Sequence, residues 1–458
     1  MAKARLIDID LPDFGMPEAR PEIPSTTYAA RLGRLREAAD AAGFDRLIVY
    51  ADREHSANLA WLSGYDPRFE ESLLVLGPGP EPAILVGNEC KGMAALAPLR
   101  MRPILFQDFS LPGQPRDRSR PFAEILSGEG IGKGSRVGLI GWKTYDRPER
   151  SDLPSYIVDE IRGLVGATGS VENATGLLID NAAGLRLVNE VEELASLEYA
   201  SCQTSGGIRN LILNLQSGLT EAEAVRLLRW NGAPLSCHLM LTAGPRATLG
   251  LLSPGDRPME RGDRFTVAFG IWGALTCRAG FLVDAPDQLP AAIPDYLDRL
   301  VAPYFEAVAE WYEALHVGQT GGTLYEIVHR HIGDPFFGVS LNPGHMIGLD
   351  EWVNSPVAPG SRVELRSGTA MQVDIIPGTG TEYFTTNIED GIALADAPLR
   401  GSFAPAYPQA WSRIQARRTF MERQLGISLH PDVLPFSNIP AFLPPFLLDS
   451  RRAMSMAG

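Results

Sequence analysis

The second half of the chain contains four apolar runs of strand length, and their spacing limits the folds that the chain can adopt. Helical patterns at residues 294–315 and 323–332 separate the runs. Neighbouring strands of this kind pair antiparallel, and the helices between them need an apolar face to cover. We therefore expect an α+β domain in which helices pack on one face of a curved antiparallel sheet. The four runs are residues 237–244, 264–283, 369–378 and 381–395.

The first half of the chain mixes short apolar strands with helices. Two of its strands flank a Gly-Pro-Gly-Pro-Glu turn, which is typical of a hairpin. Two helical patterns precede and follow the strands, and this mixture predicts a separate α/β domain. The expected strands are residues 46–50, 71–77, 82–87 and 136–141, and the expected helices are residues 26–43 and 156–164.

These patterns divide the chain into four parts. Residues 1–24 are Pro-rich and are expected to form an irregular arm over the domain or over a neighbouring subunit. The α/β domain covers residues 25–182 and the α+β domain residues 183–400. Residues 401–458 are expected to be a tail with one helix, near 409–424.

The second domain opens on a long helical pattern over residues 189–216. After it, Thr220 and Glu223 have the spacing of a capping box, in which each residue bonds the backbone of the other. This pair predicts a further helix that continues through Arg229.

The composition excludes several classes of partner. The net charge is −14, whereas a protein that binds nucleic acid or an anionic membrane needs a basic surface. No apolar run reaches the roughly 20 residues of a membrane span, and the N-terminus lacks a signal-peptide pattern. Four scattered cysteines without a CxxC pair suggest free thiols in a reducing compartment. We expect a cytoplasmic protein that acts on a small molecule without a nucleotide cofactor, because no glycine-rich phosphate motif occurs.

Several passages resemble the creatinases, prolidases and aminopeptidases P. Taken together they span most of residues 28–396, and their order and spacing carry the resemblance. It implies a creatinase-type N-terminal α/β domain followed by a pita-bread domain with a curved antiparallel sheet. It also implies a homodimer with a site shared between subunits. The passages are residues 58–76 (NLAWLSGYDPRFEESLLVL), 253–270, 277–283, 342–352 (NPGHMIGLDEW) and 367–394.

The metal-ligand positions of these peptidases are mostly lost in this sequence. The peptidases hold two divalent ions with two Asp, one His and two Glu, since several carboxylates must offset the charge of two nearby cations. Two donors out of five cannot hold such a centre. We therefore expect no cofactor, and the resemblance does not imply a standard Xaa-Pro aminopeptidase. The corresponding positions are Ala268, Ala279, His345, Ile376 and Glu389.

Strand periodicity suggests that residues two positions from the lost ligand positions could form a different site on the same face. Asp374 lies two residues before Ile376, so both side chains point to the same face of a strand. Thr266 and Cys277 share faces with the two alanines in the same way. The alternative is that these are ordinary packing residues around an inactive site, and whether a single metal binds stays open. The rebuilt site would contain Thr266, Cys277, Asp374, His345 and Glu389.

His345 is the leading catalytic candidate. It follows Pro-Gly on a loop beside acidic residues, including Glu351, that could fix its tautomer and tune its pKa. Glu389 would be a second acid or base, or would orient the substrate. Glu389 and Asp390 are adjacent, so only one of them can face the site from a strand.

The resemblance to metal-free creatinases is also incomplete. Their histidine base falls on Leu251, and the nearest histidine in sequence is His238, which we expect on a strand. His238 is a substrate-binding candidate or a core residue. Arg68 lies in the region from which these dimers supply an arginine for the substrate carboxylate. The alternative for Arg68 is a surface ion pair with Glu70 or Glu71.

Three functions are compatible with these residues. The first is a metal-independent hydrolase of a C–N bond in a small polar compound that bears a carboxylate. The second is a lyase on the same scaffold, which would abstract a proton from such a compound. The third is a non-enzymatic relative that uses the site only for binding.

Overall fold

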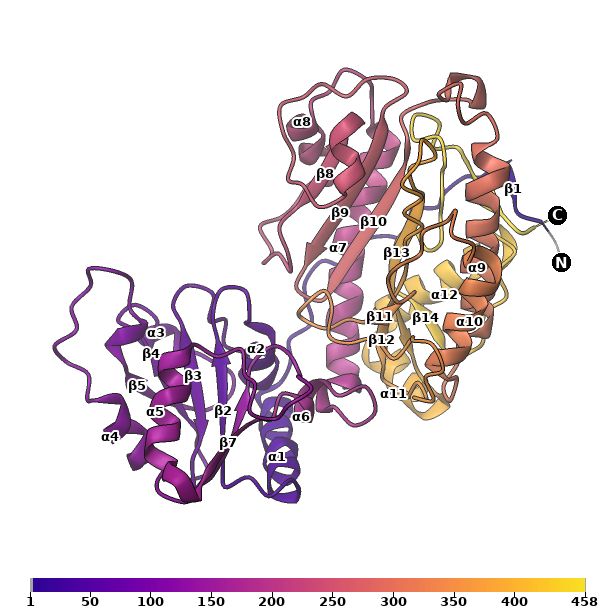
Figure 1. The fold of residues 1–458 in the computed structure, drawn as a ribbon. Helices are drawn as coiled ribbons and strands as arrows, with labels where there is room; N and C mark the ends of the chain where they lie inside the picture. The colour runs from indigo at the N-terminus through magenta and orange to yellow at the C-terminus, as the bar shows by residue number, and fades with distance from the viewer. Residues whose placement is uncertain (1–2, 458) are drawn as a thin grey trace. The chain divides into compact units, whose positions relative to one another are not determined.

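The computed structural model describes residues 3–457 and separates them into two compact units (Figure 1). One unit is residues 23–187, and the other combines the residues up to 22 with those from 188 onward. The two units meet at 22/23 and 187/188, and the sequence analysis placed divisions at 24/25 and 182/183. Among the described residues, no helix is both long and apolar enough to span a lipid bilayer.

The unit of residues 23–187 is built on a six-stranded mixed sheet. Its strands are β2 (Arg46–Ala51), β3 (Ser72–Leu76), β4 (Ala83–Val86), β5 (Arg102–Leu105), β6 (Arg136–Ile140) and β7 (Ser170–Asn173). Its α-helices are α1 (Ser25–Ala41), α2 (Ala57–Ser63), α3 (Lys91–Ala94), α4 (Phe122–Gly128), α5 (Ser155–Val165) and α6 (Gly176–Ile179). The strand order is β5-β4-β3-β2-β6-β7. The expected hairpin is β3–β4, which pairs antiparallel, and β2 pairs parallel with β6.

The larger unit is built on an antiparallel sheet. Its strands are β1 (Arg5–Asp8), β8 (Met240–Ala243), β9 (Arg264–Ile271), β10 (Ala274–Phe281), β11 (His345–Met346), β12 (Ala370–Ile375), β13 (Asn387–Leu394), β14 (Val433–Pro435) and β15 (Arg452–Ser455). Its α-helices are α7 (Val191–Asn214), α8 (Glu221–Val225), α9 (Ala302–Ala314), α10 (Gly321–Ile332), α11 (Ala397–Ala406) and α12 (Pro408–Arg423). The main sheet has the order β11-β12-β13-β10-β9-β8, and β14 pairs with β13. Helix α7 packs along β9, β10 and β13 (Figure 1).

The pairing register brings four positions of this sheet into one row. Cys277 on β10 lies opposite Ala268 on β9 and Glu389 on β13, and Glu389 lies opposite Asp374 on β12. Directly opposed residues of antiparallel strands point to the same face. The sheet therefore gathers these side chains although they are far apart in the sequence.

The other face of the same strands carries a buried ion pair. Arg278 and Asp390 are both fully buried, and Nη2 of Arg278 lies 3.0 and 2.8 Å from the two carboxylate oxygens. The hydroxyl of Ser437 also donates to Asp390, over 2.7 Å. Of the two adjacent acids, Asp390 thus faces Arg278 and Ser437, and Glu389 faces the other way, as strand alternation predicts.

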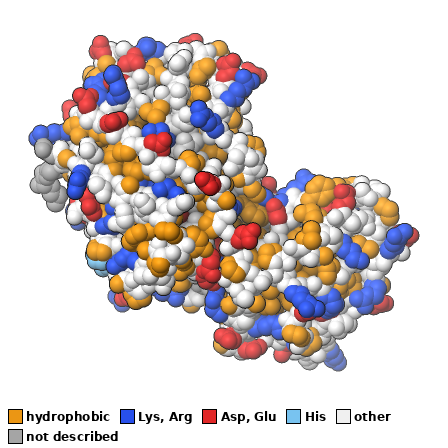
Figure 2. Space-filling model, turned by 180° about the vertical axis from the view of Figure 1, so that it is seen from behind, with side chains coloured by type: hydrophobic (Ala, Val, Ile, Leu, Met, Phe, Trp, Pro, Cys, Tyr) orange, Lys and Arg blue, Asp and Glu red, His pale blue; other side chains and the backbone are white. Residues whose placement is uncertain are grey.

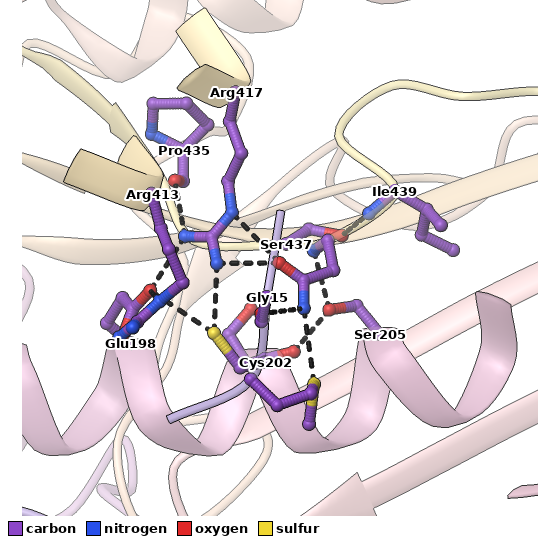
Figure 3. A network of polar contacts seen from close by, with 12 residues as sticks. Gly15, Glu198, Cys202, Ser205, Arg413, Arg417, Pro435, Ser437 and Ile439 are labelled. Carbon is purple, nitrogen blue, oxygen red and sulfur yellow. Dashed lines mark hydrogen bonds and ion pairs between the residues drawn. The ribbon is translucent and has the colours of Figure 1, made fainter. Parts of the chain in front are cut away.

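A second buried ion network joins α7 to α12 (Figure 3). Glu198 accepts hydrogen bonds from Arg413 at 2.9 and 2.7 Å and from Arg417 at 2.8 Å. The thiol of Cys202, one turn along α7, lies 3.2 Å from Glu198 and 2.9 Å from Arg417. Two guanidinium groups therefore compensate this carboxylate.

Both ends of the chain are more ordered than the sequence predicted. Residues 5–8 are not part of an irregular arm, because β1 pairs antiparallel with β15. The residues after 400 belong to the larger unit, where α11, α12, β14 and β15 pack. Long-range strand pairing of this kind leaves little signal in a four-residue segment.

Three local expectations need correction. The capping box at Thr220 forms, but α8 ends at Val225 and continues only as a short 3₁₀ turn to Leu228. The helix expected over residues 294–315 opens as a π-helical segment before α9 begins. His238 lies on the loop before β8 and not on a strand, because the preceding Gly-Ala-Pro stretch delays the strand to Met240.

The surface mixes charges of both signs. On the face that Figure 2 shows, Lys and Arg side chains are interspersed with Asp and Glu, and neither sign forms a continuous area. Electrostatics therefore does not single out that face as a binding surface.

Candidate active site

His345 is held rigidly at the start of β11. The preceding Gly344 has a φ of 119°, where a Cβ atom would lie 2.9 Å from the ring of Trp311. The imidazole is fully buried and stacks on Trp352, with ring centroids 4.1 Å apart and planes 17° apart. Its Nδ1 lies 3.2 Å from the carbonyl oxygen of Met346. A carbonyl can only accept, so Nδ1 carries a proton and Nε2 is turned toward the acids of the site.

Two buried carboxyl groups face Nε2 of His345. Oε1 of Glu389 lies 3.4 Å away and Oδ2 of Asp374 lies 3.8 Å away. Both carboxyl groups come from the central strands, so the sheet sets their positions and not a flexible loop. The imidazole can therefore exchange a proton with Glu389 after a small movement.

Cys277 adds a thiol to this pair. Its Sγ lies 2.7 Å from Oε2 of Glu389, and the thiol donates to the carboxyl oxygen. Because Oε1 of the same carboxyl faces His345, Glu389 lies between the thiol and the imidazole. The arrangement is a line of three proton-transferring groups, Cys277–Glu389–His345.

Burial dominates the acid–base properties of the site. It raises the pKa of Glu389 from 4.5 to about 7, although the hydrogen bond from Cys277 opposes the shift. Burial, and then the charge of Glu389, raise the pKa of Asp374 well above its usual range. The same two causes raise the pKa of Glu351. Burial also raises the pKa of the Cys277 thiol. The carboxyl groups can therefore hold protons near neutral pH, where a general acid or base is most effective.

Several buried polar atoms on this face have no hydrogen-bond partner. They include Nε2 of His345 and Oδ1 of Asp374, and one row further along the sheet Oγ1 of Thr242 and Oδ1 of Asn387. Buried polar atoms in folded proteins are nearly always paired with protein or water. These atoms are therefore the positions at which the site would meet water or a ligand.

The residues do not fit a dinuclear metal centre. Ala268, Ala279 and Ile376, on which the resemblance placed three of the five ligands, offer no donor atom. The site has donor atoms for a single cation. One ligand atom each of His345, Glu351 and Glu389 lies within 4.8 Å of the others, which is compatible with one ion.

The structure separates the other expected site residues. Thr266 is half-buried and pairs with Ala279, one row along the sheet from Cys277. His238 is exposed, and its Nε2 lies 2.7 Å from the backbone oxygen of Leu251. Leu251, on which the resemblance placed the creatinase base, is itself 68% exposed.

Arg68 belongs to the unit of residues 23–187. Its guanidinium binds Asp66 through two hydrogen bonds of 2.9 and 2.8 Å. Neither acid expected from the sequence is the partner in these bonds, since Glu71 accepts from Tyr50 and Glu70 accepts from backbone amides. An arginine held by one carboxylate can still exchange it for another, because such surface pairs are weak.

Some site residues were not expected from the sequence. Asn387 and Thr242 could have been found, because each lies at strand spacing from an expected residue. Trp352 could not, since nothing in a loop sequence indicates that a ring seven positions away stacks on the histidine. Cys237, half-buried beside the apolar side chains around Cys277, was also missed as a neighbour.

Comparisons with known proteins match the chain only in structure. No family model and no curated protein sequence matches it. An Xaa-Pro dipeptidase from Bacillus anthracis superposes with a TM-score of 0.61 at 18% identity, covering 81% of this chain and 96% of that one. The prolidase from Pyrococcus horikoshii OT3 gives 0.61 at 17%, covering 80% and 95%. An X-Pro aminopeptidase from Thermotoga maritima gives 0.60 at 16%, covering 80% and 94%.

The chain has the pita-bread fold. The match extends over nearly the full length of each neighbour, so the order and spacing of the sequence passages were a sound guide to the fold. These neighbours are peptidases, and at identities below 20% the likeness concerns the fold alone. On this pita-bread sheet, Cys277, Asp374, His345 and Glu389 form the cluster of ionisable groups described above.

Proposed function

We propose that the chain is a metal-independent hydrolase that cleaves a C–N bond in a small polar compound. The observation that carries the proposal is the placement of Glu389. Its carboxyl group, whose pKa is about 7, lies 3.4 Å from Nε2 of His345 inside a buried polar cluster. A carboxyl group that titrates at neutral pH beside an imidazole is suited to general acid–base catalysis.

The two groups divide the proton transfers. Glu389 takes a proton from the attacking group, and His345 delivers a proton to the departing nitrogen. The unpaired oxygens of Asp374 and Asn387 accept hydrogen bonds from the N–H groups of the compound. Since these atoms are buried, only a small compound reaches them. The resemblance to creatinase adds a carboxylate at its far end, which Arg68 of a second subunit in a homodimer would bind.

The test combines turnover with metal analysis. A panel of small N-acyl and guanidino acids is screened for release of ammonia or amine. His345→Ala and Glu389→Gln are each expected to lower turnover by about 10²–10⁴-fold. Asp146→Asn, in an exposed ion pair with Arg150, is the control and should leave it unchanged. Unchanged turnover in His345→Ala would remove the assigned role.

The metal analysis tests the other half of the proposal. Near-stoichiometric zinc, manganese or iron in the purified protein, with activity lost on chelation, would refute metal independence. That result would favour one ion held by His345, Glu351 and Glu389, whose ligand atoms are close enough to share it. A dinuclear Xaa-Pro aminopeptidase is disfavoured by the three positions without donors.

A lyase is the second candidate, because the same pair of groups could remove a proton from carbon. It would yield an unsaturated product, and in deuterated water it would exchange the substrate C–H. A hydrolase does neither. A binding protein without catalysis would bind members of the panel without product in any condition.

A further inference from the structure

We infer that Cys277 is the nucleophile of this site, so that the C–N bond is cleaved through an acyl-thioester on Cys277 with Glu389 as the base. This inference rests on the proposed hydrolase function. It narrows the substrate class to compounds in which the nitrogen is bonded to an electrophilic acyl carbon.

The geometry of the thiol is that of a nucleophile and its base. Sγ of Cys277 lies 2.7 Å from Oε2 of Glu389, within proton-transfer distance. Directly across the sheet from Cys277 is Ala268, which has a small side chain. The other oxygen of Glu389 faces His345. A nucleophile beside a base that is itself oriented by a third group is the usual pattern of covalent catalysis.

The chain contains a second cysteine–glutamate pair, and the contrast separates a structural thiol from a nucleophile. Cys202 donates to Glu198 over 3.2 Å, but Arg413 and Arg417 also bind that carboxylate (Figure 3). Their charges hold the pKa of Glu198 below its usual range, although burial opposes them. Such a carboxylate is a weak base and leaves the thiol inert.

Among the described residues, no guanidinium is hydrogen-bonded to the carboxyl group of Glu389. The charge of Arg278 lowers the pKa of Glu389, but Arg278 pairs with Asp390 on the other face and reaches only the backbone oxygen of Glu389, at 3.4 Å. The Glu389 carboxyl group therefore remains free to accept a proton. The Cys277–Glu389 pair also lies beside Nε2 of His345 and Oδ1 of Asp374, two buried polar atoms that lack partners.

The reaction balances without an oxidant or reductant. Sγ of Cys277 attacks the acyl carbon while its proton passes to Glu389, so a C–S bond forms. Glu389 passes this proton to Nε2 of His345, and the C–N bond breaks as the nitrogen takes it from Nε2 and the amine leaves. Water then attacks the thioester carbon, giving one proton to the acid–base pair. The C–S bond breaks, and the sulfur regains its proton.

Alkylation of the whole protein by iodoacetamide tests the inference without a substrate. Each cysteine is followed by mass spectrometry. Cys237 is the matched control, because it lies in the same cluster, is more exposed than Cys277, and has no hydrogen bond to a carboxylate. Exposure alone predicts that Cys237 reacts faster. The inference predicts that Cys277 reacts at least about 10-fold faster than Cys237.

The variant Glu389→Gln changes the alkylation rate of Cys277 in opposite directions, depending on whether Glu389 is the base or only a nearby charge. A neighbouring negative charge raises a thiol pKa, so removing it from a merely structural thiol would speed alkylation. If Glu389 is the base, the variant slows alkylation of Cys277 by about 10-fold or more. An equal or faster rate, or a slower rate for Cys277 than for Cys237 in the natural protein, overturns the inference.

Turnover distinguishes this inference from the proposed function. Cys277→Ala is expected to abolish turnover in the substrate panel, with its fold checked by circular dichroism. Turnover that persists in Cys277→Ala but is lost in His345→Ala overturns the nucleophile and leaves the hydrolase intact. Fast, Glu389-dependent alkylation without turnover of any compound supports the thiol and counts against the hydrolase.

Discussion

Replacing Glu389 by glutamine should stabilise the protein, and the gain should grow with pH. In the folded state its pKa is about 7 in place of 4.5, so the folded state keeps this proton over a range in which the unfolded state has lost it. Stability then falls as the pH rises through this range. The full loss is (7 − 4.5) × 1.36, or about 3 kcal/mol, of which roughly 2.5 kcal/mol falls between pH 5 and 8. Glutamine has no charge to bury, so the variant escapes this loss.

Two neighbouring carboxyl groups add to the stabilisation expected for Glu389→Gln. Its charge raises the pKa of Asp374 and of Glu351, so the substitution also eases the ionisation of both. Arg278 opposes the effect from the far face. The assay is hydrogen exchange under urea at the β13 amides, which reports the free energy of unfolding of the larger unit.

Glu198→Gln is the matched control, since it also removes a buried carboxyl group beside a cysteine. Here Arg413 and Arg417 lose their partner, so the variant should be destabilised at pH 8 by about 3–5 kcal/mol. The folded pKa of Glu198 is lowered, so this difference shrinks as the pH falls toward it. If the difference between wild type and Glu389→Gln does not change with pH, or if both variants shift stability the same way, burial does not control the ionisation of Glu389.

Three further substitutions test the framework around the site. Asp390→Asn leaves the guanidinium of Arg278 buried without its counterion and should cost about 3–5 kcal/mol, measured by urea unfolding. Gly344→Ala forces a methyl group against Trp311 at a positive φ and should lower the melting temperature and the near-UV signal of the site's aromatic rings. Thr220→Ala removes the capping box of α8 and should cost about 1 kcal/mol, with no effect on alkylation of the site.

The sequence predicted much of the larger unit because its strands are long and apolar. Each expected run contains one or two of the strands β8–β10, β12 and β13. Cys277 and Asp374, which a period of two assigned to the same face as the ligand positions, both pair with Glu389. That rule needs only local geometry. The short strands β1, β11, β14 and β15 could not be predicted, because each is formed by pairing with a segment far away in the sequence.

The sequence indicated which residues lie near one another better than it indicated the contacts between them. Sequence spacing indicated that Cys277 and Glu389 share a face, but not that they are hydrogen-bonded or that His345 lies beyond Glu389. Those relations depend on the pairing register between strands, which no single segment contains. The bonds from Arg68 to Asp66 were not expected for a related reason, since a turn of the backbone brings Asp66 to the guanidinium.

The ion pair between Arg278 and Asp390 limits how strands β10 and β13 can shift relative to each other. A slip of one residue between β10 and β13 would turn Asp390 toward His345 and bury Glu389 among the helices. The slip would also separate the buried guanidinium of Arg278 from Asp390, which costs several kcal/mol. The ion pair therefore stabilises the pairing register in which Glu389 points toward His345. Because the ion pair lies on the opposite face, a substitution among the residues that line the site leaves this register in place.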